Sequence, residues 1–133
     1  MLALKTKNRE YVDLINGLFN VQDLQGVRFG LAVSKNIRIL QNELKDLEDA
    51  SVASTEFMVL AEKVKGCNGD KEALTALEEA HVDLIKERED QLLEVNSMME
   101  DEAEITLHPI SIAVLPEQIS AAQITNIDRL LID

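Results

Sequence analysis

The 133-residue sequence predicts a mainly α-helical protein built around a long antiparallel helical hairpin that resembles a coiled coil. Apolar residues recur at alternating steps of four and three on both sides of residues 66–69, which is the spacing of a coiled-coil seam. Aromatic residues make up only 3% of the chain, which favours helix-on-helix packing over a β-sandwich. Together these observations predict two long helices that fold back on each other.

The seam of this hairpin is defined by its heptad-like positions. Before the turn they are Val33, Ile37, Leu40, Leu44, Leu47, Ser51, Ser54, Met58 and Ala61. After the turn they are Leu74, Leu77, His81, Leu84, Arg88, Gln91, Val95 and Met98. Antiparallel pairing about a short turn places Leu40 opposite Val95 and Ser54 opposite His81. The middle of the seam is therefore a polar layer, which can fix register at some cost in stability. Its members are Ser51, Ser54, His81 and Arg88.

The turn itself carries strong sequence signals. Gly66 and Gly69 flank Asn68, and Asp70 is placed to cap the helix that follows. We expect the first long helix over residues 27–65 and the second over 70–99. Residues 50–54 are small and weakly helical, so a break there is an alternative. In the absence of Pro or Gly we favour a continuous helix.

Both ends of the chain flank this hairpin in one predicted domain, residues 1–133, made of an N-terminal arm and helix (1–26), the hairpin (27–99) and a strand with a C-terminal helix (100–133). The first helix has one apolar face, formed by Tyr11, Leu14, Ile15 and Leu18. Residues 104–108 alternate like a strand, and we expect them to pair with residues 2–5 in a two-stranded sheet. Ser120 and Gln123 match a capping box that opens the last helix. That helix has an apolar side, formed by Ile124, Ile127, Leu130 and Leu131.

The net charge of −12 is unevenly distributed along the chain. Residues 1–40 carry a net charge of +3, residues 41–104 carry −13 and residues 105–133 carry −2. A field of this sign repels nucleic acid and attracts basic protein surfaces. We therefore expect a protein partner with a basic surface and no direct contact with nucleic acid.

Catalytic motifs are absent from the sequence. Two histidines, one cysteine and no glycine-rich loop leave few ways to build acid–base or nucleophilic catalysis. Glu78 and His81 have the spacing of a di-iron carboxylate helix, but no second copy of that motif exists, and a seam histidine is the simpler interpretation. The sequence thus predicts a protein that is not an enzyme, with no catalytic residues, cofactor or metal. No segment approaches the ~20 apolar residues of a membrane span, so we expect no membrane contact and a soluble, intracellular protein.

The candidate binding surface is the run of acidic residues between positions 78 and 104. Its predicted partner-binding residues are Glu79, Asp83, Glu87, Asp90 and Glu94. A solvated helix face is the alternative interpretation. Val52, Phe57, Val59 and Leu60 lie off the seam and form an apolar face, for the first or last helix or for a partner. The seam can be filled within one chain or shared in a homo-oligomer, and the sequence leaves both open.

Several short segments resemble a family of small bacteriophage proteins of unknown function, of the siphophage type and best known from phages of Gram-positive bacteria. They are Leu4-Lys5-Thr6-Lys7-Asn8, Ala32-Val33-Ser34-Lys35-Asn36-Ile37, Glu43-Leu44, Glu104-Ile105-Thr106-Leu107 and a closing Ser-x-x-Gln helix ending in Leu130-Leu131-Ile132. The resemblance implies a phage origin, a location in the host cytoplasm or the virion, and a non-enzymatic role. We expect a virion or assembly component or an accessory protein that binds other proteins. The alternative is an acidic inhibitor that occupies a basic groove of a host defence or nucleic-acid-binding protein through residues 78–104.

Overall fold

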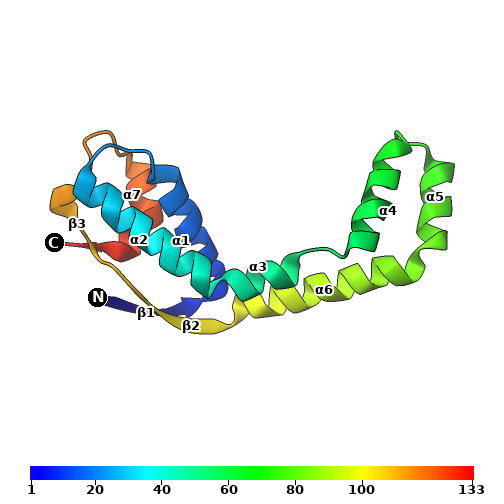
Figure 1. Ribbon diagram of the computed structural model, residues 1–133, viewed down its shortest axis with the longest axis horizontal. Helices are drawn as coiled ribbons and strands as arrows, with labels where there is room; N and C mark the ends of the chain where they lie inside the picture. Colours follow the sequence, from blue (N-terminus) through cyan, green and yellow to red (C-terminus); the bar gives the residue numbers. More distant parts are fainter. The chain divides into compact units, whose positions relative to one another are not determined.

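The computed structural model describes residues 1–133 and is mainly helical, with two small two-stranded sheets (Figure 1). The elements in chain order are β1 (Leu2–Lys7), α1 (Asn8–Val21), α2 (Val27–Glu43), α3 (Lys45–Ser51), α4 (Thr55–Gly66), α5 (Lys71–Ala80), α6 (Val82–Glu100), β2 (Glu102–Leu107), β3 (Ile110–Ser111), the 3-10 turn η1 (Ile112–Val114), α7 (Ala121–Ile127), the 3-10 turn η2 (Asp128–Leu130) and β4 (Leu131–Ile132). They form two compact units: unit 1 is Met1–Asp46 with Met99–Asp133, and unit 2 is Leu47–Met98. The expectation of a single domain stays a prediction.

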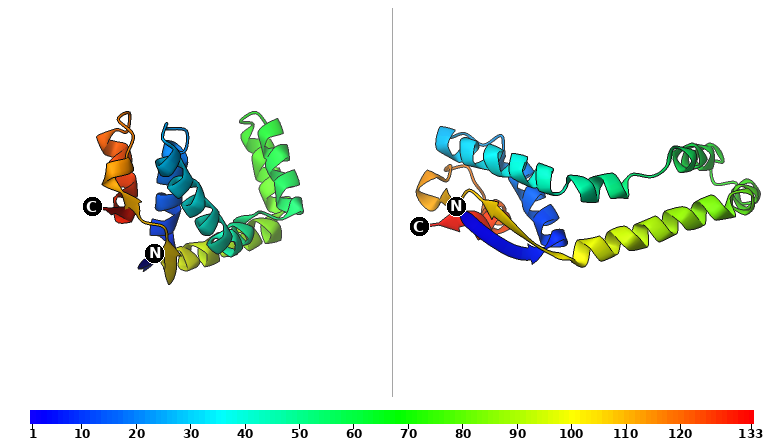
Figure 2. Two further views of the ribbon diagram at one scale, coloured as in Figure 1. Left: turned by 60° about the vertical axis from the view of Figure 1, so that its left-hand side comes forward. Right: turned by 60° about the horizontal axis from the view of Figure 1, so that its bottom comes forward.

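The sheet that joins the two ends of the chain lies in unit 1. Strands β1 and β2 pair antiparallel, with Leu2 opposite Leu107 and Lys7 opposite Glu102 (Figure 2). Side chains alternate between the two faces of a strand, and Ile105 and Leu107 are buried while their neighbours on β2 are exposed. The predicted pairing of residues 2–5 with residues 104–108 is confirmed and extends further than expected.

The core of unit 1 is formed by α1, α2, α7 and the inner faces of the strands. Its fourteen buried apolar residues are Tyr11, Leu14, Ile15, Leu18, Val21, Phe29, Val33, Ile37, Leu40, Ile105, Leu107, Ile110, Ile127 and Leu130. The predicted apolar face of the first helix is therefore confirmed. Gly17 of α1 lies so close to α7 that an added Cβ would be 2.9 Å from the carbonyl oxygen of Asn126. Only glycine permits this close contact between the two helices.

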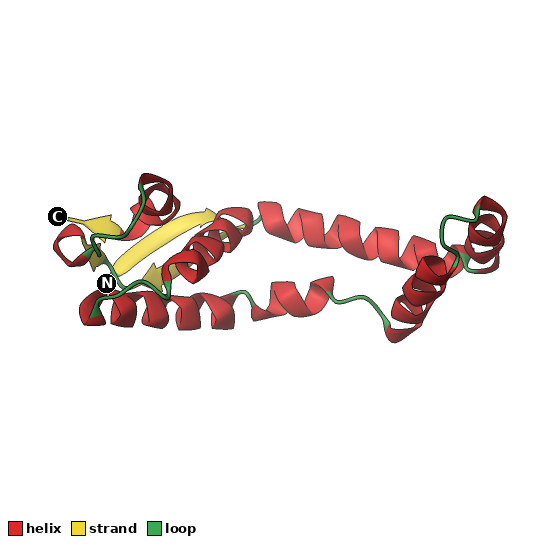
Figure 3. Ribbon diagram, turned by 90° about the horizontal axis from the view of Figure 1, so that it is seen from above, coloured by secondary structure: helices red, strands yellow, loops and turns green.

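A second sheet in unit 1 was not predicted from the sequence. Strands β3 and β4 pair in parallel, with Ile110 opposite Leu131 (Figure 3). The capping box of Ser120 and Gln123 is present as predicted, but α7 ends at Ile127. Because Leu131 pairs with the buried Ile110, the chain leaves the helical path that the apolar spacing indicated.

The predicted long hairpin over residues 27–99 is not confirmed. Val33, Ile37 and Leu40 are buried, but they pack in the core of unit 1 and not in a seam that continues through the hairpin. The prediction of a continuous first helix is wrong, because Leu44 and residues 52–54 separate α2, α3 and α4 (Figure 3). The predicted second helix is likewise divided at His81 into α5 and α6.

The turn at residues 66–69 is confirmed within unit 2. Asn68 and Gly69 have φ angles of +50° and +81°, in the left-handed region that Asn and Gly tolerate best. The Asp70 carboxylate accepts hydrogen bonds from the N–H groups of Glu72 and Ala73, so it caps α5 as predicted. Helices α4 and α5 lie side by side across this turn (Figure 1).

Candidate partner-binding surface

Two polar side chains of α6 donate hydrogen bonds to backbone carbonyls at the break between α3 and α4. Arg88 Nη1 donates to the carbonyl oxygen of Ser51 at 2.9 Å. Gln91 Nε2 donates to the carbonyl oxygens of Ala50 at 2.8 Å and Val52 at 2.7 Å. The last carbonyls of a helix have no partner within the helix, and a cation there complements the helix dipole. Arg88 and Gln91 therefore stabilise the C-terminus of α3, at a place where the sequence predicted a continuous helix.

The other side of the break is closed by Ser54. Its hydroxyl accepts a hydrogen bond from the N–H of Phe57 at 3.2 Å and caps α4. The Phe57 ring centroid lies 5.8 Å from the Arg88 guanidinium, within range of a cation–π interaction. The C-terminus of α3 and the N-terminus of α4 thus both have hydrogen-bond partners, on either side of residues 52–54. A capping serine after weakly helical residues 50–53 is the sequence signal that indicates this break.

The predicted polar layer is brought together only in part. Arg88 reaches Ser51 through the backbone carbonyl, as described above, while Ser54 is engaged in capping α4. His81 Nδ1 lies 2.9 Å from the carbonyl oxygen of Leu77, at the C-terminus of α5. His81 therefore occupies the corner between α5 and α6. Its ring contacts the last turn of α5 and not the polar residues of the predicted layer.

The predicted seam positions on α5 and α6 form a half-buried stripe. Its members are Leu74, Leu77, Leu84, Arg88, Gln91, Val95 and Met98, with His81 at the corner between the helices. No side chain of either helix is fully buried. In unit 2 as a whole, Leu47 and Leu60 are the only buried apolar side chains. The apolar spacing thus marks the right face of these helices, but that face is only partly covered.

Large apolar side chains of unit 2 remain exposed. They are Val52, Met58, Val59, Val64, Val82, Leu92 and Leu93. Leu93 on α6 is 68% exposed and Val82 is 58% exposed. Of the apolar face predicted off the seam, Val52 and Val59 are exposed, Phe57 is half-buried and Leu60 is buried. Unit 2 thus has more apolar surface than its own packing covers.

All five predicted partner-binding residues are exposed. Asp83, Glu87, Asp90 and Glu94 follow one another on α6 at steps of four, three and four, so they share one helix face, here called the acidic stripe. Glu79 lies on α5, beyond the corner at His81. The four ion pairs of the chain are Lys7–Glu100, Arg9–Glu100, Lys65–Glu62 and Arg129–Glu10. No carboxylate of the acidic stripe is neutralised by any of them.

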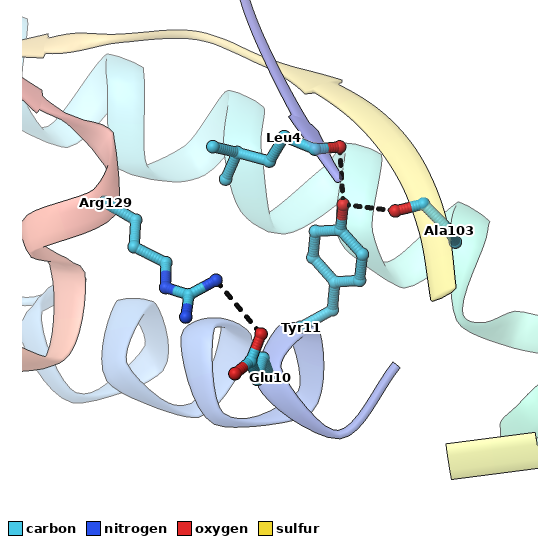
Figure 4. A network of polar contacts seen from close by, with 5 residues as sticks. All are labelled: Leu4, Glu10, Tyr11, Ala103 and Arg129. Carbon is cyan, nitrogen blue, oxygen red and sulfur yellow. Dashed lines mark hydrogen bonds and ion pairs between the residues drawn. The ribbon is translucent and has the colours of Figure 1, made fainter. Parts of the chain in front are cut away.

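The polar groups with shifted pKa values lie in unit 1 and stabilise its fold. The Tyr11 hydroxyl lies 2.8 Å from the carbonyl oxygen of Leu4 on β1 and 2.7 Å from that of Ala103 on β2 (Figure 4). Burial raises the pKa of Tyr11, although backbone N–H groups nearby oppose the shift. Lys7 and then Arg9 hold the pKa of Glu100 below its usual value. These groups tie the two strands and the start of α1 together, and no reacting constellation surrounds them.

The structure contains no group of three or more His, Cys, Asp and Glu side chains placed to hold a metal ion. None of its helices is both long enough and apolar enough to cross a membrane. Comparison with protein families, curated proteins and solved structures finds no match to this chain. The bacteriophage resemblance therefore stays a prediction.

Proposed function

We propose that this protein acts without catalysis, by binding a protein partner with a basic surface through unit 2. The observation that carries the proposal is the small number of buried side chains there. Unit 2 spans Leu47–Met98, yet its only buried apolar side chains are Leu47 and Leu60. Small folded units depend on buried apolar area, and a partner that covers exposed side chains supplies it.

The charge of unit 2 favours a basic partner. Unit 2 carries thirteen acidic and five basic side chains, a net charge of −8. The carboxylates of the acidic stripe have no ion-pair partner within the chain. A field of this sign accelerates association with a basic surface and opposes nucleic acid.

One exposed apolar side chain, Leu93, adjoins the acidic stripe. Leu93 follows Asp90 by three residues on α6, so their side chains are neighbours on the helix surface. A docking surface commonly combines an apolar centre that loses its water with a charged rim. Leu93 supplies apolar area beside the carboxylates, which distinguishes this surface from a face that only confers solubility.

A role as a virion or assembly component, or as a phage accessory protein, follows if the bacteriophage resemblance holds. Mass spectrometry of purified virions tests the structural form of this role. We expect the chain in particles at a fixed ratio to the major virion proteins. Its absence from particles would exclude a virion component and leave the accessory role.

An acidic inhibitor of a host protein is the second candidate, supported by the unpaired carboxylates of the acidic stripe. The test of partner binding is the charge-reversed variant Asp83→Lys/Glu87→Lys/Asp90→Lys, compared with native chain in crosslinking within host cells. We expect the variant to lose its crosslinks to basic proteins. The matched control, Asp23→Lys/Glu117→Lys/Asp133→Lys, reverses three exposed carboxylates of unit 1. This control should retain the crosslinks. Equal crosslinking by both variants would contradict the proposal.

A further inference from the structure

Unit 1 contains a groove of about 470 Å³ with a basic lining. Its walls are Lys35, Arg38, Ile39, Asn42 and His108. The first four recur along α2 at steps of three, one and three, which places them on one face of the helix. His108 comes from the segment that follows β2. The groove is therefore the α2 surface with a second wall from a distant part of the sequence.

A buried side chain holds the two walls together. Asn36 is fully buried and follows Lys35 directly. Its Nδ2 donates to the carbonyl oxygen of His108 at 2.9 Å, and its Oδ1 accepts from the N–H of His108 at 2.7 Å. Both polar ends of the Asn36 amide are thus paired with the backbone N–H and C=O of one residue, as a neighbouring strand would pair with them. His108 is consequently fixed beside Lys35 and Arg38, and the groove is formed before any ligand arrives.

The charge of this groove is uncompensated. Lys35 and Arg38 take part in none of the four ion pairs of the chain. No carboxylate is among the residues that line the groove. The chain as a whole has a net charge of −12, so a groove lined by two cations and no carboxylate is a basic site on an acidic protein. The amide of Asn42 adds hydrogen-bond donors to the same face.

We propose that this groove binds the acidic stripe of a second copy of the chain. The inference rests on the proposed function, because it names the basic surface that unit 2 binds. Lys35 and Asn42, with Arg38 between them, are seven residue steps apart on α2, and Asp83 and Asp90, with Glu87 between them, are seven steps apart on α6. Both distances are about 10 Å along a helix axis. Two helices lying against each other thus place each carboxylate near one donor.

The contact has properties that follow from its exposure. Lys35, Arg38 and Asn42 are exposed, so each of the two ion pairs and the Asn42 hydrogen bond contributes little, and the three contacts together supply the affinity. Salt screens such pairs, so association weakens as ionic strength rises. The contact joins two different surfaces, so one chain can supply the stripe while the other supplies the groove.

Charge exchange between two variants tests the proposal with the full-length chain. The groove variant is Lys35→Glu/Arg38→Glu and the stripe variant is Asp83→Lys/Glu87→Lys. In sedimentation velocity at low salt, we expect native chain to associate as concentration rises. Each variant alone should associate more weakly, on the order of tenfold or more. An equimolar mixture should form a complex again, because the new lysines of one variant face the new glutamates of the other.

Matched controls keep the charge change and move it elsewhere. Lys63→Glu/Lys65→Glu on α4 matches the groove variant, and Asp23→Lys/Glu117→Lys in unit 1 matches the stripe variant. Both controls should associate like native chain. The neutral pair Lys35→Gln/Arg38→Gln repeats the test without new repulsion, and circular dichroism verifies that every variant is folded.

Three results would contradict the proposal that the groove binds the acidic stripe. Native chain that stays monomeric at all concentrations is one, and native chain that binds a model polyphosphate in place of itself is another. The third is association that the stripe variant loses and the groove variants retain. That third result leaves the proposed function standing, because unit 2 then binds a basic surface other than this groove.

Discussion

Units 1 and 2 differ in what covers their apolar side chains. Fourteen of the sixteen buried apolar side chains lie in unit 1, where helices, strands and both ends of the chain meet. The remaining two, Leu47 and Leu60, lie in unit 2. In unit 1 the buried polar groups of Tyr11 and Asn36 are hydrogen-bonded to backbone, so its core is also satisfied.

The same apolar spacing runs through both units, with different results. On α2 it faces α1 and the strands, and Val33, Ile37 and Leu40 become core. On α5 and α6 the same spacing leaves a half-buried stripe, because no neighbouring element covers it completely. Apolar periodicity thus identifies the face of a helix that seeks cover, while the number of layers decides how much cover it finds.

The largest expected effect comes from removing one leucine side chain in each unit. Leu40→Ala in unit 1 should lower the free energy of unfolding by about 2–5 kcal/mol, because a fully buried side chain leaves a cavity. Leu93→Ala in unit 2 should change it by less than about 0.5 kcal/mol, because that side chain is 68% exposed. Urea unfolding followed by circular dichroism measures both. Similar losses would contradict the difference between the units.

The next largest effect comes from replacing two glycines, which should change the stability in opposite directions. Gly17→Ala should destabilise the chain by about 1–3 kcal/mol, because its Cβ meets the Asn126 backbone of α7. Gly66→Ala at the end of α4 meets nothing within 4 Å and should be neutral or stabilise by up to about 1 kcal/mol. Thermal unfolding of both variants gives the comparison. Stabilisation by Gly17→Ala would show that α1 and α7 do not pack closely.

Tyr11 makes the stability of unit 1 depend on pH in the alkaline range. Its pKa is raised in the fold, mainly by burial, so the unfolded state loses the phenol proton first. The stabilisation is present below the unfolded pKa of about 10 and is lost as pH rises through the folded pKa. Since Tyr11 is the only tyrosine, tyrosinate absorbance follows it directly. Titration at an ordinary pKa in the native chain would contradict its burial.

The variant Tyr11→Phe completes this test. Loss of the hydrogen bond to the strand carbonyls should cost about 1 kcal/mol at neutral pH. The variant should also lose the decline in stability above pH 10, because no phenol remains to ionise. Urea unfolding at neutral and alkaline pH compares the two chains. An equal decline in both would assign the alkaline effect to other groups.

The smallest expected effect concerns the break in unit 2. Gln91→Ala removes the donors to the carbonyls of Ala50 and Val52. Water can replace these donors, so the loss should be about 0.5–1 kcal/mol and local to the C-terminus of α3. Hydrogen exchange of the surrounding amides measures it, with the exposed Asn96→Ala as control. Unchanged exchange around the break would show that Gln91 does not stabilise it.

Much of unit 1 was predictable because its signals are local. Alternation over residues 104–108 indicated the strand, Ser120 and Gln123 indicated a helix start, and Tyr11 and its neighbours at helical spacing indicated a buried face. The parallel pair β3 and β4 was missed, since each strand has only two residues and its partner is distant in sequence. No periodic pattern fits within two residues.

The errors in the predicted hairpin have one physical origin. Heptad spacing describes a helix face and does not name its partner, so the predicted pairing of Leu40 with Val95 assumed a partner that the sequence does not specify. The helix break at residues 52–54 is stabilised by Arg88 and Gln91, which meet the backbone carbonyls of residues 50–52 only in the folded chain. All five acidic residues of the predicted surface are exposed, as expected. The basic groove was not predicted, because His108 reaches Lys35 and Arg38 only through its contact with Asn36 in the folded chain.

Hydrogen exchange of the native chain, at concentrations low enough to prevent association, tests most directly the claim that unit 2 lacks a core of its own. Amides of α1, β1 and β2 should exchange slowest, with an opening free energy equal to that of global unfolding. Amides of α5 and of residues 82–98 on α6 should exchange through local openings of much lower free energy. Equal protection of the two units would contradict the claim and remove the reason for a partner on unit 2.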